Sequence, residues 1–244
     1  MENPEPSYSS VWGALKAFNR KLPARAQSLL GGALDLVGIK PPRTTDDVAT
    51  DWASRRSDEW VQGYRDSWDR PHRHVLVDCV ARFAPVSSVL ELGCHAGPNL
   101  RLLARRCPDA RITGIDVNLP AIDEARRSLA ACSNVTANHG DLRRELASLE
   151  DNAVDCIVSC FALAYVDPRE IGEVLGQAWR AARKALILME PHPGPDQDAE
   201  PSGWRHEYAL LLERAGFPGA HTEPLERDDR AGELNAVTIA AKGC

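Results

Sequence analysis

VLELGCHAGPNL, residues 89–100, is the most informative segment of this sequence. Its first part is an apolar run typical of a short buried strand, and a turn containing Gly93 and Gly97 leads from this strand into a predicted helix. Glycines at such a turn let the backbone approach a ligand closely. Because many nucleotide-binding domains have a similar turn, the ligand has to be inferred from the segments on either side.

Predicted strands and helices alternate through the rest of the chain. Strands rich in Val, Ile and Leu that alternate with helices indicate a parallel, doubly wound sheet. The last two strands are joined by the charged turn ERDDRAG, which is too short for a crossover helix, so we expect an antiparallel hairpin. The predicted fold is a Rossmann-like α/β fold with seven strands. Strands are predicted over 86–92, 111–117, 134–138, 153–160, 184–190, 219–225 and 234–241, and helices over 97–106, 119–131, 142–149, 168–182 and 202–215.

The N-terminal part of the chain is predicted to be helical. Apolar residues at helical spacing over 10–38 indicate two short helices separated by Pro23. Further helices are expected over 45–82. We expect them to form a cap over the mouth of the ligand-binding site, with a core that contains Trp52, Trp60 and Trp68. We therefore expect three parts: an extension (1–44), a helical cap (45–82) and a ligand-binding domain (83–244).

Composition excludes several classes of partner and site. The formal net charge is -6, which argues against nucleic acid as the main partner because phosphate backbones require clustered positive charge. The first residues do not resemble a signal peptide, and no apolar run is long enough to span a membrane, so a cytoplasmic protein is expected. The seven cysteines include no Cys-x-x-Cys pair, so neither a metal site nor a disulfide framework is predicted.

Two acidic residues follow further strands of the predicted sheet. Asp116 ends the second strand, where a carboxylate accepts hydrogen bonds from ribose hydroxyls. Asp141 follows the third strand, where a side chain reaches an adenine amino group. Ligands of open α/β sheets bind at the carboxyl ends of the strands, so the glycine turn and both acids belong to one predicted site.

With these motifs, the sequence resembles the class I S-adenosylmethionine-dependent methyltransferases over about residues 75–244. VLELGCHAGPNL resembles the first motif of that family, ITGIDVN the ribose motif, GDL the adenine motif, and AVDCIVSCFALAYV the fourth-strand motif that lines the gap between cofactor and substrate. The nearest resemblance is to bacterial enzymes acting on small molecules or glycan-related acceptors. It implies S-adenosylmethionine as the cofactor, contacted by Glu91, Gly93, Cys94, His95, Gly97, Asp116, Val117, Asp141, Leu142 and Cys160.

His95 departs from the family pattern, which has glycine at this position. A residue there is expected to have a positive φ, which glycine adopts most easily. Histidine is among the other residues enriched in that region, so the loop is expected to keep its shape. We expect His95 to be a loop residue rather than a catalyst.

The expected reaction is an in-line attack by an oxygen or nitrogen of the acceptor on the cofactor methyl group. Tyr165, just after the fourth strand, is expected to contact the substrate, and the candidate acid–base residues are Glu190, His192 and His206. One alternative is a non-catalytic cofactor-binding or scaffold protein on the same fold. Another is a nicotinamide-dependent oxidoreductase, which the missing G-x-G-x-x-G pattern disfavours.

The extension over 10–38 has its own candidate partners. Its apolar positions are accompanied by Lys16, Arg20, Lys21 and Arg25. An apolar helix face must be buried against something, which here is the core of the same chain, a second copy of the chain or an anionic membrane surface. The sequence leaves these three open and favours the first two.

Overall fold

The computed structural model describes residues 44–192, 203–217, 219–225 and 235–242. The helices predicted over 10–38 lie outside the described residues. The chain divides into two compact units, Met1–Thr44 and Thr45–Cys244, and the following description concerns the second. No helix in the described ranges is both long enough and apolar enough to cross a membrane.

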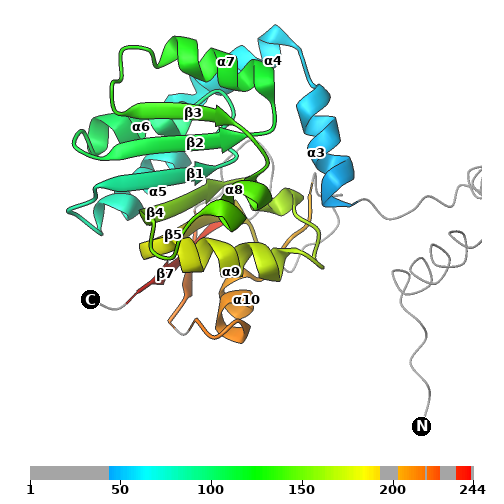
Figure 1. The fold of residues 1–244 in the computed structure, drawn as a ribbon, viewed down its shortest axis with the longest axis vertical. Helices are drawn as coiled ribbons and strands as arrows, with labels where there is room; N and C mark the ends of the chain where they lie inside the picture. The colour runs from blue at the N-terminus through cyan, green and yellow to red at the C-terminus, as the bar shows by residue number, and fades with distance from the viewer. Residues whose placement is uncertain (1–43, 193–202, 218, 226–234, 243–244) are drawn as a thin grey trace, which may run out of the picture. The chain divides into compact units, whose positions relative to one another are not determined.

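A seven-stranded sheet forms the centre of this unit (Figure 1). The strand order is β3-β2-β1-β4-β5-β7-β6, and the first five strands in this order are parallel. β1 is an interior strand whose partners β2 and β4 lie on opposite sides of it, so the chain reverses its winding direction next to β1. Ligands bind at such a switch point in open α/β sheets. The strands are β1 (Ser88–Leu92), β2 (Arg111–Asp116), β3 (Val135–His139), β4 (Val154–Cys160), β5 (Ala182–Pro191), β6 (His221–Pro224) and β7 (Asn235–Ala241).

The last two strands form the predicted antiparallel hairpin, and β7 is inserted between β5 and β6. β7 runs antiparallel to both neighbours, with Thr238 opposite Leu188 of β5 and Thr222 of β6. The predicted Rossmann-like fold with a terminal antiparallel pair is confirmed.

Helices cover both faces of the sheet because the strand side chains alternate between two apolar clusters. On β1, Val89 belongs to the cluster that packs against α5 and α6, whereas Leu90 belongs to the cluster that packs against α9 and α10. Figure 1 shows α8 and α9 in front of the sheet and α6 behind it. The helices outside the cap are α5 (Pro71–Ala81), α6 (Pro98–Arg106), α7 (Leu119–Ser128), α8 (Leu142–Ser148), α9 (Ile171–Ala181) and α10 (Tyr208–Arg214).

The cap consists of α3 (Thr45–Ser54), α4 (Asp58–Arg65) and the short helix η1 (Asp66–Asp69), and continues into α5. The buried Asn118 side chain fixes the end of α3: its Nδ2 donates to the carbonyl oxygens of Trp52 and Arg55 at 2.7 and 2.8 Å. α4 packs on α7, where Arg65 donates to Glu124 at 2.8 Å. α3 and α4 are thus both attached beside the carboxyl end of β2.

Candidate active site

An open cavity of about 930 Å³ lies between the cap and the carboxyl ends of the central strands. Nine of the predicted cofactor contacts line it, together with Tyr165: these are Glu91, Gly93, Cys94, His95, Asp116, Val117, Asp141, Leu142 and Cys160. Gly97 is not in the wall. It is the N-terminal cap residue of α6, with φ 76°, and shapes the turn.

The turn after β1 has three residues with positive φ: Gly93 (72°), His95 (48°) and Gly97 (76°). A Cβ on Gly93 would lie 2.3 Å from the Ala162 Cβ, and one on Gly97 would lie 2.8 Å from the Leu129 Cδ1. Gly93 is therefore required both by backbone conformation and by space, whereas Gly97 is required chiefly by its backbone conformation, because the end of the Leu129 side chain can shift. The predicted positive φ at His95 is confirmed.

His95 is buried under the cap, with 6% of its surface exposed. Its ring lies 4.4 Å from the Trp60 ring and 4.2 Å from the Tyr64 ring, measured between centroids. Burial, with the nearby cations Arg73 and Arg55, lowers the pKa of His95 to about 4. The imidazole is therefore neutral at physiological pH.

Asp116 faces the cavity and also organises the loops around it. Its Oδ2 accepts from the backbone N–H of His95 at 2.9 Å, and its Oδ1 accepts from that of Asn118 at 2.8 Å. Burial raises the pKa of this carboxyl group. A carboxylate has about four acceptor sites, so two remain for hydroxyl donors in the cavity.

Glu91, Asn99 and Arg73 form a buried polar chain in the wall of the same cavity. Asn99 Nδ2 donates to Glu91 Oε1 at 2.6 Å, and Arg73 donates to Asn99 Oδ1 at 2.8 Å. Ser67 accepts two further Arg73 donors. Glu91 Oε2 is buried and has no hydrogen-bond partner among the described residues. Burial raises the pKa of Glu91 to about 7.

Sequence reasoning did not identify Arg73 or Asn99 as site residues. Arg73 is one of several arginines near the start of α5, and a sequence pattern does not show which arginine is buried. Asn99 belongs to the glycine-turn segment and lies on the first turn of α6. Its position directly after the glycine turn is the sequence feature that could have identified it as a site residue.

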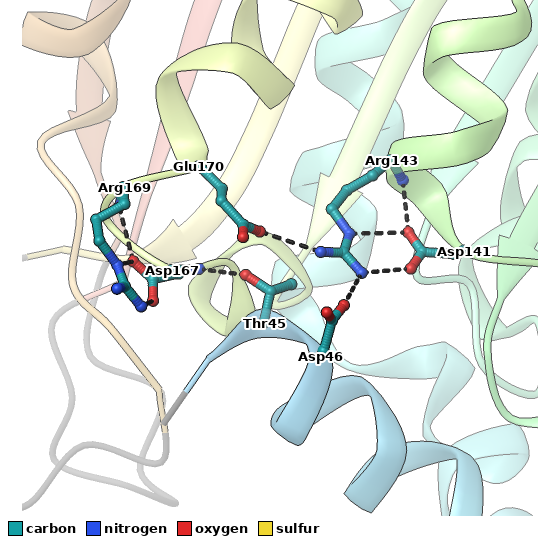
Figure 2. Close-up of polar contacts among 7 residues, drawn as sticks. All are labelled: Thr45, Asp46, Asp141, Arg143, Asp167, Arg169 and Glu170. Atoms are coloured by element: carbon teal, nitrogen blue, oxygen red, sulfur yellow. Dashed lines mark hydrogen bonds and ion pairs between the residues drawn. The ribbon is translucent and has the colours of Figure 1, made fainter. Parts of the chain in front are cut away.

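Asp141 lines the cavity, but its carboxylate is engaged by Arg143 (Figure 2). Oδ1 accepts from the Arg143 backbone N–H at 2.8 Å and caps α8, and Oδ2 accepts from the Arg143 guanidinium at 2.6 Å. The same guanidinium donates to Asp46 of α3 at 2.6 Å and to Glu170 at 3.1 Å. Through Arg143, Asp141 therefore helps to hold α3 of the cap in place. The sequence predicted only an adenine contact for Asp141 and not this structural role.

A second contact fastens the start of α3 (Figure 2). The Thr45 hydroxyl accepts from the backbone N–H of Asp167 at 2.8 Å. The Asp167 carboxylate accepts from the backbone and the guanidinium of Arg169, which holds the turn before α9. With Asn118 at the other end, α3 is attached at both ends.

Aromatic side chains form the cap side of the cavity. Trp52 and Tyr64 line it, and the Trp52 ring lies 4.9 Å from the Tyr165 ring in an edge-to-face arrangement. Trp52, predicted in the core of the cap, thus also lines the cavity, which the sequence could not show because one helix turn does not reveal which ring meets the strand ends. Trp68 does pack in the core, below the Arg101 guanidinium.

The three candidate acid–base residues do not line the cavity. Glu190 is buried, and its carboxylate accepts from the Ser159 hydroxyl and from the backbone N–H groups of residues 162–164. His206 is also buried and its Nε2 donates to the Val166 carbonyl at 2.9 Å. His192 Nε2 lies 3.6 Å from a Glu207 carboxylate oxygen. Glu190 thus holds the loop that carries Tyr165.

The comparisons with known proteins agree with this arrangement. Residues 89–185 match the methyltransferase domain family. A trans-aconitate 2-methyltransferase from Enterobacter sp. (strain 638) is 34% identical over 154 residues, which are 61% of this chain and 55% of that protein. The chain spans about a third to just over half of the length of the curated relatives it matches.

Two solved structures from Burkholderia thailandensis share the fold, each at 18% identity. One is an O-methyltransferase family protein with a TM-score of 0.61, covering 82% of this chain and 63% of its own. The other is a 1,6-didemethyltoxoflavin-N1-methyltransferase with a TM-score of 0.60, covering 83% of this chain and 92% of its own. The sheet order, the glycine turn, the acid at the end of β2 and the domain matched over residues 89–185 together support the resemblance to the class I S-adenosylmethionine-dependent methyltransferases.

Proposed function

We propose that this chain binds S-adenosylmethionine in the cavity and transfers its methyl group to an oxygen or nitrogen of a small-molecule acceptor. The observation that carries this proposal is the distribution of polar groups along one cavity wall. Asp116 lies at one point of this wall, and Glu91 and Arg73 lie at another. Their chemistry matches the separate polar parts of the cofactor.

The residues present fit the cofactor. Glu91 Oε2, which is buried without a partner in the described part of the chain, suits the ammonium group of the amino-acid moiety. Arg73 uses three of its five donors within the protein and has two left for the carboxylate. Asp116 has acceptor capacity for the ribose hydroxyls. The apolar Leu142 and Val117 would hold the adenine ring.

The cofactor, when bound, supplies the electrophilic methyl group. The protein residues would then position the acceptor, exclude water and shield the reacting groups. The cap covers the cavity through Val48, Ala49 and Trp52. Since Glu190, His192 and His206 lie away from the cavity wall, we assign none of them as the base.

The aromatic side chains support an acceptor with a flat or ring-shaped face. Trp52, Tyr64 and Tyr165 line the cavity on the cap side, and aromatic rings pack well against planar groups. The toxoflavin-related ligand of the structural neighbour is a small molecule of this kind. A sugar ring of a glycan-related acceptor would use the same surface, so both classes belong in a screen.

Isothermal titration with S-adenosylhomocysteine, S-adenosylmethionine and NADH tests the cofactor. We expect binding of the first two and none of the third. A screen of planar heterocycles, phenols, carboxylates and sugars with methyl-labelled cofactor then tests transfer. Failure to bind S-adenosylhomocysteine would contradict the proposal, whereas binding with no labelled product from any class would favour the non-catalytic alternative.

A further inference from the structure

His95 combines two unfavourable features in one cavity-lining residue. Its backbone has φ 48°, in the left-handed region that favours glycine. Its Nδ1 and Nε2 are both buried, and neither has a hydrogen-bond partner within the described residues. Burying a polar group without a partner costs free energy. Glycine would avoid both costs at this position.

Packing alone does not account for an imidazole here. Trp60 and Tyr64 contact the ring, and an apolar side chain would fill the same space without burying two ring nitrogens. An unpaired polar group of this kind in a cavity wall is typical of a residue whose partner is a ligand. The ligand group has to suit a neutral imidazole, which offers one N–H donor and one nitrogen acceptor.

The neighbouring groups indicate which part of a ligand His95 meets. Of the two cations that act on its ring, Arg73 has the larger effect and Arg55 the smaller, and Arg73 and Glu91 line the same cavity as His95. These two residues suit a zwitterion, with Glu91 for the ammonium group and Arg73 for the carboxylate. A neutral N–H donor strengthens the binding of a carboxylate without repelling a positively charged sulfur nearby.

We propose that His95 is a cofactor-binding residue, whose imidazole N–H donates a hydrogen bond to the carboxylate of the amino-acid moiety that Arg73 also holds. This inference rests on the proposed function. It makes His95 a contact that the glycine of the family pattern cannot provide. The low pKa of about 4 supports the role because the ring stays neutral beside the cofactor.

Two ligands isolate this contact. S-adenosylhomocysteine carries the amino-acid moiety, and 5′-methylthioadenosine has the same adenosine and thioether without it. By isothermal titration of the full chain, His95→Gly should weaken S-adenosylhomocysteine roughly tenfold or more, the loss of a hydrogen bond to a charged group. The affinity for 5′-methylthioadenosine should not change. His95→Asn, which tolerates positive φ and keeps an N–H donor, should recover part of the affinity.

Asn152→Gly is the matched control, because Asn152 also has positive φ (56°) and does not line the cavity. It should leave both affinities unchanged. Equal weakening of both ligands by His95→Gly would mean that the imidazole only shapes the loop, and unchanged or tighter S-adenosylhomocysteine binding would mean that it does not touch the cofactor. Either result overturns this inference. A wild-type chain that binds neither ligand would instead overturn the proposed function.

Discussion

Asp116 has two roles at the level of the single residue. Its carboxylate faces the cavity and also accepts from the backbone N–H groups of His95 and Asn118. Asp116→Ala should therefore weaken S-adenosylmethionine binding about tenfold or more and also lower the melting temperature. Calorimetry and thermal unfolding measure the two effects separately. A folded variant with unchanged affinity would remove Asp116 from the cofactor site.

Glu91 should make cofactor affinity depend on pH. Burial raises its pKa to about 7, so the carboxyl group is largely protonated below that pH and ionised above it. Only the ionised form attracts the ammonium group of the cofactor, so affinity should rise with pH across about 7. The charged groups that act on Glu91 are Arg73, which favours ionisation, and Asp116, which opposes it.

Glu91→Gln tests this dependence, because glutamine keeps the acceptor for Asn99 Nδ2 and cannot ionise. Titrations of S-adenosylhomocysteine between about pH 6 and pH 8 should give a rising affinity for the wild type and a flatter, weaker one for the variant. Parallel curves in the two proteins would place the titrating group elsewhere.

At the level of the element, Asn118 joins α3 to α7. Its Oδ1 caps α7 by accepting from the Ala121 N–H at 2.8 Å, while its Nδ2 holds the last carbonyls of α3. Serine is a good cap but is too short to replace both Nδ2 bonds. Asn118→Ser should therefore keep α7 intact and release the end of α3.

Amide hydrogen exchange measures this release. Protection over residues 45–54 should fall in Asn118→Ser, whereas protection over 119–128 should stay near the wild-type level. Asn118→Ala is the comparison, since it loses the cap as well and should cost about 1 kcal/mol more. Unchanged exchange in α3 would show that Thr45 and Asp46 alone hold the helix.

The order of strands and helices was predictable from the sequence because apolar residues recur at a different spacing in strands and in helices. The helix ends were less predictable. Helix α9 was predicted from residue 168 and begins at Ile171, because Asp167 bonds the Arg169 N–H and forms a turn first. The glycine turn and Asp116 were identified because both follow strands directly. Arg73 and Trp52 were not, because only tertiary packing brings the cap to the strand ends.

At the level of the whole molecule, a chain beginning at Thr44 should fold and bind S-adenosylhomocysteine with wild-type affinity. The unit Thr45–Cys244 contains both apolar clusters and all of the described residues that line the cavity. Calorimetry of the two proteins checks this expectation. A large loss of affinity in the shorter chain would show that residues 1–43 contribute to the site.

The partner of residues 10–38 is a separate question for the same pair of proteins. Sedimentation with anionic vesicles tests a membrane surface, and the mass in solution tests a second copy of the chain. We expect the shorter chain to differ from the full chain in one of these two measurements. Identical behaviour in both would assign the extension to the core of its own chain.

The position of β7 has a consequence for how the chain is made on the ribosome. β7 lies between β5 and β6 but follows both in the sequence. Until residues 235–241 emerge from the exit tunnel, β5 has one open edge and β6 has no strand to pair with. An open edge is a template for pairing with other chains. Nascent chains that stall before β7 are therefore the form of this protein most exposed to aggregation and most dependent on chaperones.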